Sequence, residues 1–551
     1  MMAKLPSFDK LPRRLLGSIR RRASRIWSGE TPDTYFDLNQ PQELAKVFDS
    51  LGVPQADGQG GDSIRVSRIF DFREDLRTLF PLGFTPQGRR NLLTWLLSNG
   101  IKEYKFTAND CLAFLRELDR TPDRGLVRLY LIRPDWQRDI PDALTPVGWP
   151  KFLQYLRAHF GLAGRWSRRV RLPQSAMMPI QRQTRGVNVL AHFRYASGLQ
   201  EAAFGIVNAI KRAGLPLAKR DLPVTYDCDW SDHECYYDLE QFDTTIYVAA
   251  ANTFPEVWYP RAGLYARPGV RRIAVWYWEL EDVPAEWHEQ LRWADEVWAP
   301  TNFIADAFRK CVQCPVRTIL PGIERPRFTP KSRSELGLPE GKFLFLFSFD
   351  MGSVMVRKNP LALIRAFRNA FRPEDNVHLV IKVSRGEFVP EDLAVLQAAA
   401  NAPGIQLINR VMPRNDVLAL LNLADCYVSP HRSEGLGLGL AESMLLGKPA
   451  IATGYSGNLD FMTNETSYLI DYSMVPVEPS RSIFNPYPAG ARWAEPNSDH
   501  LTKLLRQVYD NPDEAKAKGL MAKAHIEKVM SLEAYSQRIR QRLDEIHQAA
   551  E

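Results

Sequence analysis

Short apolar runs alternate with amphipathic stretches from residue 186 onward, and this alternation restricts the possible folds more than any other feature of the sequence. The run 187–193 (VNVLAHF) is typical of a buried strand, and the stretch 199–213 after it is typical of a helix. Because strands that alternate with helices pair in parallel, the sequence predicts a Rossmann-like α/β domain here. Its further strands are predicted at 245–250, 272–277, 296–299 and 316–320.

A second series of the same kind begins after residues 321–339, which are rich in proline and charge and are predicted to connect two domains. It opens at 343–349 (FLFLFSF) and continues with apolar runs at 378–383, 406–409 and 426–429. Two such domains in tandem are expected to face each other across a cleft, with ligands at the carboxyl ends of both sheets. The predicted fold class is therefore α/β, with two Rossmann-like domains and a mainly helical region before them.

The chain has 551 residues, which is long for one hydrophobic core, so several domains are expected. Composition and pattern predict where each one begins and ends. The predicted parts are a basic amphipathic segment (1–30), a mainly helical domain (31–180), two Rossmann-like domains (181–325 and 326–530) and a C-terminal helix (531–551) that crosses back to the first of them.

The helical region contains a weak internal repeat with an offset of 60 residues. Thr85-Pro86 precedes one apolar stretch and Thr145-Pro146 precedes another. Thr is a favourable N-cap and Pro suits the first turn of a helix, so each pair is predicted to open an amphipathic helix. Two interpretations stay open: a duplicated helical unit, or two unrelated helices that begin with the same common signal.

The formal net charge of +7 is confined to the N-terminus. Residues 1–27 contain eight basic side chains and one acidic side chain, which leaves 63 of the 71 Lys and Arg residues to balance 63 of the 64 Asp and Glu residues. Apolar residues of this segment recur at helical spacing, so we predict a helix that lies on an anionic membrane surface. The alternatives are a solvated basic tail and a helix packed on its own protein. Because the rest of the chain is balanced, no nucleic-acid partner is predicted.

The sequence also bears on the compartment. It has no apolar run long enough to span a membrane and no apolar core of a signal peptide at its start. Its six cysteines do not make a disulfide framework in a chain of this size, which favours a reducing compartment. We therefore expect a cytoplasmic protein that is peripheral on the inner face of the membrane.

The segment from His431 to Glu442 (HRSEGLGLGLAE) carries the strongest chemical signal in the sequence. It follows an apolar strand and leads into a helix, and its alternating glycines allow the backbone to approach a ligand closely. Glu434 and Glu442 can each bind a pair of neighbouring hydroxyl groups, with a phosphate at the glycines between them. A nucleotide sugar has this layout of sugar, diphosphate and ribose. The alternative is a tight strand-to-helix turn with two exposed acids.

This block resembles the E-x7-E signature of retaining family-4 glycosyltransferases, which have the two-domain GT-B fold. The resemblance covers residues 186–549 and includes the segments 456–458 (SGN) and 357–360 (RKNP). It implies a donor site in the C-terminal Rossmann-like domain and an acceptor site in the N-terminal one. It also implies that Glu434 lies by the donor sugar hydroxyls and that Glu442 binds the ribose hydroxyls. The turn that would contact the donor consists of Gly435, Leu436 and Gly437.

The resemblance further implies that two adjacent cations, Arg357 and Lys358, neutralise the diphosphate. Departure of a nucleoside diphosphate builds negative charge on its outer phosphate, and fixed cations lower the barrier to that step. Lys382, at the end of the predicted strand 378–383, is a second candidate for the same role. The alternative for the pair is a solvated loop.

No metal ion is predicted in this site. The reaction of the family is understood to take place on one face of the sugar, with the leaving phosphate assisting deprotonation of the acceptor. No Asp-x-Asp motif stands at the equivalent strand end. A nucleotide-diphosphate sugar is the expected donor substrate, and no separate cofactor is expected.

In the first Rossmann-like domain, Ser197-Gly198 follows the first strand and resembles the family's glycine turn that faces the donor phosphates. A later strand ends in 276–281 (WYWELE), where many relatives have a histidine. This run resembles a subgroup with an aromatic-Glu motif, in which Glu279 would position the acceptor or the sugar. The alternative is an aromatic cluster that packs a domain edge. Which residue acts as a base, if any does, stays open.

Two groups of residues contain metal-ligand types. Cys311 and Cys314 have the spacing of half a zinc ribbon, and the loop 228–235 (CDWSDHEC) is dense in Cys, Asp and His. A structural site that joins the two groups is one interpretation. Because closed zinc sites need four well-placed ligands, we predict ordinary thiols and no metal.

These features together predict an enzyme that transfers a hexose or deoxyhexose, with retention, from a nucleotide-diphosphate sugar to a glycan or lipid-linked glycan in cell-surface polysaccharide synthesis. The alternative is a catalytically silent subunit that binds a nucleotide sugar or a glycan in a polysaccharide assembly complex. Glu434, Glu442 and Lys358 favour the enzyme, because a silent subunit has no need to keep them.

Overall fold

The computed structural model describes residues 63–548, with gaps at 121, 179–184, 196, 224–235, 252–254, 325–326, 478–486 and 489. The predicted membrane segment 1–27 and the loop 228–235 lie outside the described residues. The chain divides into two compact units. The first consists of Met1–Gln183, Asp221–Leu239 and Glu256–Pro268, and the second of Thr184–Arg220, Glu240–Pro255 and Gly269–Glu551.

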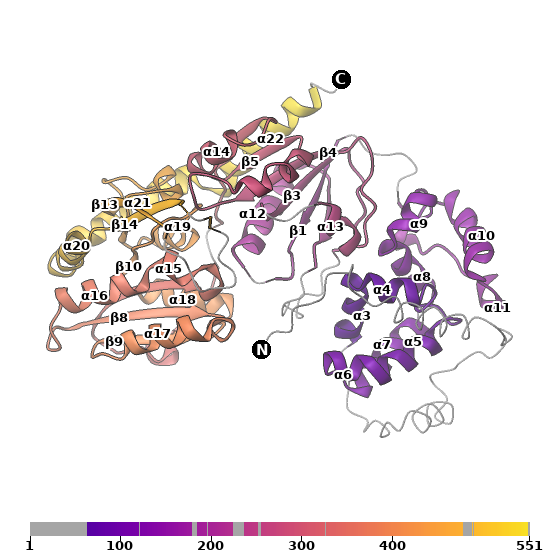
Figure 1. Ribbon diagram of the computed structural model, residues 1–551, viewed down its shortest axis with the longest axis horizontal. Helices are drawn as coiled ribbons and strands as arrows, with labels where there is room; N and C mark the ends of the chain where they lie inside the picture. Colours follow the sequence, from indigo (N-terminus) through magenta and orange to yellow (C-terminus); the bar gives the residue numbers. More distant parts are fainter. Residues whose placement is uncertain are drawn as a thin grey trace. The chain divides into compact units, whose positions relative to one another are not determined.

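The described part of the first unit is built from helices, as the sequence predicts (Figure 1). They are α3 (Ser63–Phe72), α4 (Glu74–Leu79), α5 (Arg89–Trp95), α6 (Ile101–Tyr104), α7 (Ala108–Arg120), α8 (Pro122–Leu131), α9 (Pro134–Asp139), α10 (Gly148–Phe160), α11 (Gly164–Ser167) and α13 (Pro255–Arg261). A π-helical turn, Leu96–Gly100, joins α5 to α6. Aromatic rings fill the core between them, and Phe84, Phe114 and Trp136 are each at most 1% exposed. This unit therefore has its own hydrophobic core.

The weak sequence repeat of this unit corresponds to a repeated structure. Helices α4 and α9 begin 60 residues apart and also end 60 residues apart. The Thr85 hydroxyl donates to the carbonyl of Leu82 at 2.7 Å, and the Thr145 hydroxyl donates to the carbonyl of Asp142 at 2.8 Å. Two unrelated helices that merely begin with Thr-Pro would not also share the helix and the turn that come before this pair. The structure therefore favours the duplicated unit over two unrelated helices.

The two copies also contact the same neighbouring segment through equivalent positions. Arg77 Nη2 donates to the carbonyl of Pro260 at 2.6 Å. Gln137 Nε2, 60 residues later, donates to the carbonyl of Gly263 at 2.7 Å. Both side chains are buried, Arg77 at 1% and Gln137 at 6% exposure. The end of α13 is therefore held by one polar side chain from each copy.

The second unit contains two six-stranded sheets. The first has the strand order β2-β1-β3-β4-β5-β6. Its strands are β1 (Val187–Ala191), β2 (Leu217–Asp221), β3 (Thr244–Ala250), β4 (Arg271–Tyr277), β5 (Glu296–Ala299) and β6 (Val316–Thr318). The pairs β1–β3, β3–β4, β4–β5 and β5–β6 are all parallel, with Ile246 opposite both Val189 and Ile273. Helices α12 (Gly198–Arg212) and α14 (Asn302–Arg309) pack on this sheet.

The second sheet has the order β12-β11-β10-β7-β8-β9, and all of its strand pairs are parallel. Its strands are β7 (Phe343–Asp350), β8 (Val377–Ser384), β9 (Ile405–Asn409), β10 (Cys426–Ser429), β11 (Ala450–Thr453) and β12 (Tyr468–Ile470). The hairpin β13 (Tyr472–Pro476) and β14 (Arg492–Pro496) lies outside it and is antiparallel. The helices are α15 (Met355–Lys358), α16 (Pro360–Ala370), α17 (Pro390–Ala400), α18 (Arg414–Leu423), α19 (Leu438–Leu445), α20 (Ser498–Asp510), α21 (Pro512–Val529) and α22 (Leu532–Gln548).

The predicted fold class is confirmed by these two sheets. In β7, the consecutive residues 344–347 (LFLF) are all at most 1% exposed. A strand buried in this way on both faces reads as a continuous apolar run, because helices cover both sides of a parallel sheet. The chain thus has two Rossmann-like domains in tandem, the GT-B architecture, after a helical region.

The C-terminal helix α22 packs against α12 of the first sheet domain. Arg542 forms a two-pronged ion pair with Glu296 of β5, with Nε–Oε1 and Nη2–Oε2 distances of 2.7 Å each. Glu296 is completely buried; Trp298 Nε1 also donates to its Oε1 at 2.9 Å, and the two-pronged cation comes from this helix. The last helix of the chain is therefore part of the first Rossmann-like domain's packing.

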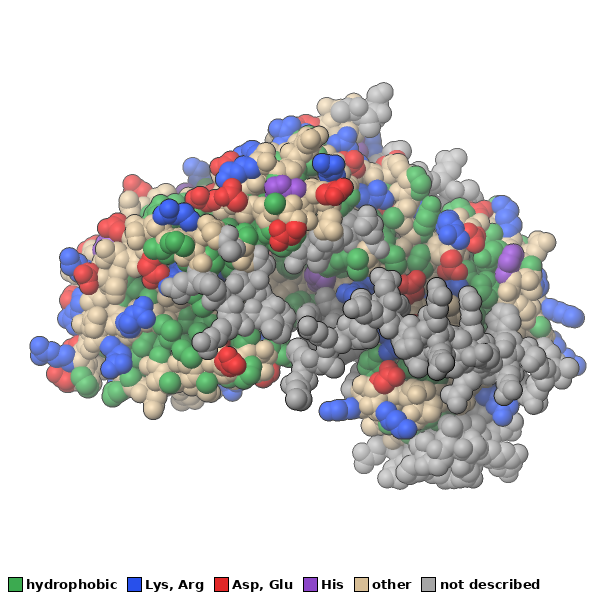
Figure 2. All heavy atoms as spheres, in the orientation of Figure 1, with side chains coloured by type: hydrophobic (Ala, Val, Ile, Leu, Met, Phe, Trp, Pro, Cys, Tyr) green, Lys and Arg blue, Asp and Glu red, His purple; other side chains and the backbone are tan. Residues whose placement is uncertain are grey.

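The described surface carries both signs of charge. On the face seen in Figure 2, Lys and Arg side chains are interspersed with Asp and Glu side chains. Among the helices that the structure describes, none has the length and apolar character needed to cross a bilayer.

Candidate active site

The Glu434–Glu442 motif forms the connection between β10 and α19. Gly437 stands directly before α19 with φ of +88°, a backbone conformation that glycine adopts without a steric penalty. The segment around Gly457 lies directly on this turn. The Gly457 N–H donates to the carbonyl of Glu434 at 2.9 Å, and a Cβ added at Gly457 would come within 1.9 Å of the Gly435 carbonyl oxygen. The two glycine-containing segments of the sequence motif therefore pack against each other.

Four predicted side chains meet beside this turn. Lys358 Nζ lies 2.5 Å from Glu434 Oε1, and Arg357 Nη1 lies 3.3 Å from Glu434 Oε2. Arg357 Nη2 lies 3.7 Å from Glu279 Oε1. Arg357 and Lys358 come from α15 after β7, Glu434 comes from the loop after β10, and Glu279 comes from the loop after β4. The cluster thus joins both Rossmann-like domains.

The cluster is buried, and its charges depend on one another. The side chain of Glu434 is 10% exposed, and those of Lys358 and Arg357 are 16% and 3% exposed. Burial alone would raise the pKa of Glu434, but Lys358 and Arg357 outweigh it and lower this pKa to about 2. Burial lowers the pKa of Lys358, and Glu434 opposes that change. The predicted alternative of a solvated Arg-Lys loop does not describe these residues.

Arg357 also organises the backbone around it. Its Nη1 donates to the carbonyl of Ser433 at 2.8 Å and its Nη2 to that of Ser353 at 3.1 Å. Its buried Nε–H has no hydrogen-bond partner within the described residues. The short helix α15 lies between Val354 and Asn359, both at positive φ (63° and 57°), a strained arrangement for residues other than glycine. Between these two positions, α15 presents two cations side by side at the Glu434 carboxylate.

Glu442 lies apart from this cluster and has its own cation. It is 4% exposed on α19, and Arg414, the first residue of α18, forms a two-pronged ion pair with it. Arg414 Nε also lies 3.7 Å from Glu201 Oε1 in the first turn of α12. The sequence analysis did not identify Arg414 or Glu201. A buried acid requires a cation, but this rule does not say which of many arginines supplies it.

The remaining predicted donor residues occupy separate places. Lys382 is 7% exposed at the end of β8, where burial lowers its pKa and Asp350 opposes that change. Ser197 caps α12, its hydroxyl accepting from the Gln200 N–H at 3.3 Å, and Gly198 opens that helix. No interaction in the described residues joins these three to the Glu434 cluster. Glu201, three positions after Gly198 on α12, is linked to the motif acid Glu442 through Arg414.

The aromatic run before Glu279 serves packing, whereas Glu279 belongs to the charged cluster. Trp276 and Trp278 are at most 3% exposed, and Trp278 meets the Trp287 ring edge-on at 5.0 Å between centroids. The Glu279 carbonyl accepts the Ser433 hydroxyl, and its carboxylate lies 3.4 Å from the Tyr487 hydroxyl. The packing interpretation therefore applies to the two tryptophans, and the role predicted for Glu279 stays a prediction.

His431, which opens the motif, is a structural residue. It is completely buried, with Nδ1 3.1 Å from the Ser429 hydroxyl and Nε2 3.1 Å from Asn458 Oδ1. Burial lowers its pKa, so the neutral ring is favoured at neutral pH. Its hydrogen bonds connect the end of β10 to the 456–458 segment.

The cysteine pair is not assembled into a metal site. In the described part of the chain, no group of three or more His, Cys, Asp or Glu side chains is placed to hold a metal ion. Cys311 and Cys314 are both free, and burial raises the pKa of each thiol, to about 11 for Cys311. The second predicted group, 228–235, lies outside the described residues.

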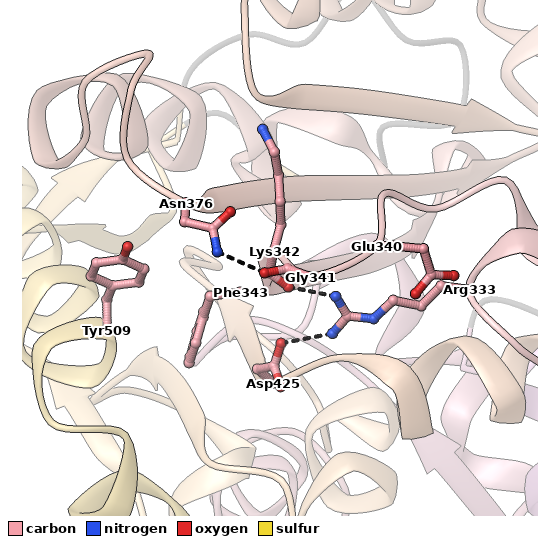
Figure 3. A pocket seen from close by; sticks show the side chains of 8 residues that line it. All are labelled: Arg333, Glu340, Gly341, Lys342, Phe343, Asn376, Asp425 and Tyr509. Atoms are coloured by element: carbon pink, nitrogen blue, oxygen red, sulfur yellow. Dashed lines mark hydrogen bonds and ion pairs between the residues drawn. The ribbon is translucent and has the colours of Figure 1, made fainter.

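A hollow of about 540 Å³ lies at the amino end of β7 (Figure 3). Three of its polar side chains are paired: Arg333 lies 3.1 Å from Asp425, and Asn376 donates to the Gly341 carbonyl at 2.6 Å. It is at the opposite end of the strand from Asp350 and α15. Because ligands of parallel α/β folds bind at the carboxyl ends of strands, this hollow is not the candidate site.

Comparison with known proteins gives a partial match. Residues 328–473 match the family described as Glycosyl transferases group 1. The chain is also similar to two proteins named D-inositol 3-phosphate glycosyltransferase, with 28% identity over 158 residues in Arthrobacter sp. (strain FB24) and 33% over 153 residues in Thermobifida fusca. These alignments cover 27% and 26% of this chain and 37% and 35% of those relatives. The chain therefore matches little more than a third of their length.

Two solved structures are distantly similar to this chain, each over the same share of its length. Sucrose-phosphate synthase from Thermosynechococcus elongatus is 14% identical, with a TM-score of 0.47 over 66% of this chain and 99% of that chain. HepE from Anabaena, in complex with UDP and glucose, is 12% identical, with a TM-score of 0.45 over 66% of this chain and 100% of that chain. The family match, by contrast, contains Arg357, Lys358 and both motif acids. Residues 328–473 thus match the group 1 glycosyl transferases, which confirms the resemblance to family-4-like glycosyltransferases found in the sequence.

Proposed function

We propose that this protein is a glycosyltransferase that moves a sugar, with retention of configuration, from a nucleotide-diphosphate sugar to a glycan or lipid-linked glycan. The observation that carries the proposal is the buried cluster of Glu434, Lys358 and Arg357 beside the glycine turn, within the segment that matches the family. Replacing a whole buried ion pair by apolar residues of similar size often leaves the stability of a protein unchanged or raises it, so a buried charged cluster is a functional candidate.

The proposed chemistry assigns each charge a task. The bond between the anomeric carbon and the diphosphate oxygen breaks, and the electron pair leaves with the phosphate. Lys358 and Arg357 stabilise the negative charge that develops there, and the unpaired Nε–H of Arg357 is one donor available to it. The acceptor oxygen bonds to the anomeric carbon on the same face, and its proton passes to the departing phosphate. This step requires no metal ion.

Glu434 is proposed to bind hydroxyl groups of the donor sugar. Its low pKa keeps it an ionised hydrogen-bond acceptor throughout the physiological range. Glu442 is proposed to bind the ribose hydroxyls, and the backbone of Gly435, Leu436 and Gly437 is proposed to lie along the donor between them. The spacing of the two acids along one turn and helix supports this division.

The first Rossmann-like domain is proposed to hold the acceptor. Glu279 would position the acceptor or the sugar, since its carboxylate already lies at the Arg357 guanidinium. Ser197 and Gly198 at the start of α12 would face the donor phosphates, with Lys382 as an additional cation. We also propose that the domains have the limits predicted from the sequence, which are 31–180, 181–325, 326–530 and 531–551.

The setting is proposed to be cell-surface polysaccharide synthesis on the inner face of the membrane. The basic segment 1–27 would bind anionic lipid there, because each basic side chain near such a surface contributes about 1 kcal/mol. A lipid-linked acceptor would then be presented at the same surface.

The proposal is tested first by a thermal-shift screen of the full chain against UDP, GDP, ADP and dTDP. A bound product stabilises the folded protein by mass action, so one of them should raise the melting temperature. Hydrolysis of the matching nucleotide sugars is then measured for three proteins: wild type, Lys358→Ala and Glu442→Ala. Both variants should lose the activity and keep the wild-type circular dichroism spectrum.

Lys503→Ala is the matched control, because Lys503 is exposed on α20. It should keep full activity. Full activity of Lys358→Ala or Glu442→Ala would contradict the assigned roles. Nucleotide binding without any hydrolysis or transfer would instead support the silent scaffold subunit.

A further inference from the structure

Arg414 is the one described cation that pairs with Glu442, and it connects three helices. Its guanidinium contacts both carboxylate oxygens of Glu442 on α19, with Nη1 3.3 Å from Oε2. On its other side, Nε lies 3.7 Å from Glu201 on α12. Glu201 and Glu442 belong to different Rossmann-like domains. Arg414 is thus a bridge between the domains at the place where the ribose of a donor is proposed to bind.

The chemistry of a carboxylate explains what this contact does. An ionised carboxylate has about four lone-pair positions, and a two-pronged guanidinium occupies two of them. The other two can accept the two hydrogen bonds of a ribose diol. A protonated carboxyl group has fewer acceptor positions and holds the diol less well. Binding of a ribose at Glu442 therefore requires that this buried group stays ionised.

We propose that Arg414 is a positioning residue for the donor nucleotide, which keeps the Glu442 carboxylate ionised and oriented for the ribose hydroxyls, and that Glu201 modulates it from the other domain. This inference rests on the proposed role of Glu442 in binding ribose. It goes further by naming a residue outside the E-x7-E motif and an electrostatic control across the domains.

The electrostatics of the site support opposite roles for the two neighbours. Burial raises the pKa of Glu442, the Arg414 guanidinium opposes that rise, and the Glu201 carboxylate adds to it. The buried Tyr427, on β10, is a further titratable group that senses Glu442, and its own pKa is raised by burial, so it is neutral at physiological pH. Loss of Arg414 should therefore move the pKa of Glu442 upward, and loss of the Glu201 charge should move it downward.

The direction in which nucleotide affinity changes with pH follows from the need for an ionised Glu442. Nucleotide affinity that needs ionised Glu442 is full above its pKa and is lost as the pH falls through that pKa. Each pH unit below the pKa weakens binding about ten-fold. In an Arg414 variant this loss should begin at a higher pH than in the wild type, and in a Glu201 variant at a lower pH.

The test is isothermal titration of UDP and GDP into the full chain between pH 5 and pH 9. Arg414→Gln should bind at least about ten-fold more weakly than the wild type at pH 6 and regain affinity toward pH 9. Arg414→Lys, which keeps the positive charge, should recover most of the loss. Glu201→Gln should shift the affinity profile to lower pH. Arg368→Gln, an exposed arginine on α16, is the control and should follow the wild type.

The outcomes separate this inference from the proposed function. If Glu442→Gln binds both nucleotides as tightly as the wild type, the proposed role of Glu442 fails. If Glu442→Gln loses binding but Arg414→Gln follows the wild type at every pH, only the inference about Arg414 fails. Equal weakening of Arg414→Gln at all pH values, without rescue by lysine, would also overturn it. The side chain of Arg414 is 43% exposed, so these variants should fold, and their melting temperatures verify this.

Discussion

Replacing Glu434 by Gln tests how strongly the charged cluster is coupled to folding. The substitution keeps the size of the side chain and removes its charge. Two cations, Lys358 and Arg357, then stay buried without their carboxylate partner. Leaving one side of a buried ion pair without its partner is strongly destabilising, by about 3–5 kcal/mol in typical cases.

The lowered pKa of Glu434 gives a second value, of similar size, for this loss of stability. The pKa of Glu434 falls from 4.5 to about 2 in the folded protein. Each unit of difference between folded and unfolded states corresponds to about 1.4 kcal/mol, so the ionised form contributes about 3 kcal/mol at pH 7. Because the folded pKa is the lower one, this contribution is present above pH 4.5 and is lost as the pH falls toward 2. At pH 3.5 about 2 kcal/mol should be left.

The assay is urea unfolding of the wild type and Glu434→Gln at pH 7 and pH 3.5, followed by tryptophan fluorescence. The variant should be less stable by about 3 kcal/mol at pH 7 and by about 2 kcal/mol at pH 3.5. Glu533→Gln, which removes an exposed partner of Arg212, is the control and should leave the stability almost unchanged. An equal loss at both pH values, or none at pH 7, would refute the electrostatic reasoning.

Three further predictions address other parts of the molecule. Gly457→Ala would place a Cβ 1.9 Å from the Gly435 carbonyl oxygen, so the motif turn should move and UDP or GDP binding should fall at least ten-fold, as measured by titration; unchanged affinity would contradict the packing. Arg542→Met leaves the fully buried Glu296 without its two-pronged partner and should destabilise the protein by about 3 kcal/mol in urea unfolding; a change under about 0.5 kcal/mol would be inconsistent with this. Deletion of residues 1–27 should release the protein from anionic vesicles in sedimentation at physiological salt, and undiminished binding would exclude the proposed membrane segment.

The relation between sequence and structure differs for the fold and for the site. Local patterns sufficed for β7, whose apolar run required burial on both faces, and for the start of α19, where Gly437 permits a positive φ. The 60-residue repeat was also visible, but its Thr-Pro signal alone did not distinguish duplication from coincidence. The matching hydrogen bonds of Thr85 and Thr145 decided that question.

The sequence by itself determined the elements and the motif that carries Glu434 and Glu442, because both depend on neighbours a few residues away. Only the tertiary structure decided which charges face each other. Lys358 is 76 positions from Glu434, Arg414 is 28 from Glu442, and Arg542 is 246 from Glu296. Many acids and bases of a chain with 71 Lys and Arg residues satisfy the same local rules. The partner of a buried charge is set by the packing of helices and sheets, and spacing along the chain carries no information about it.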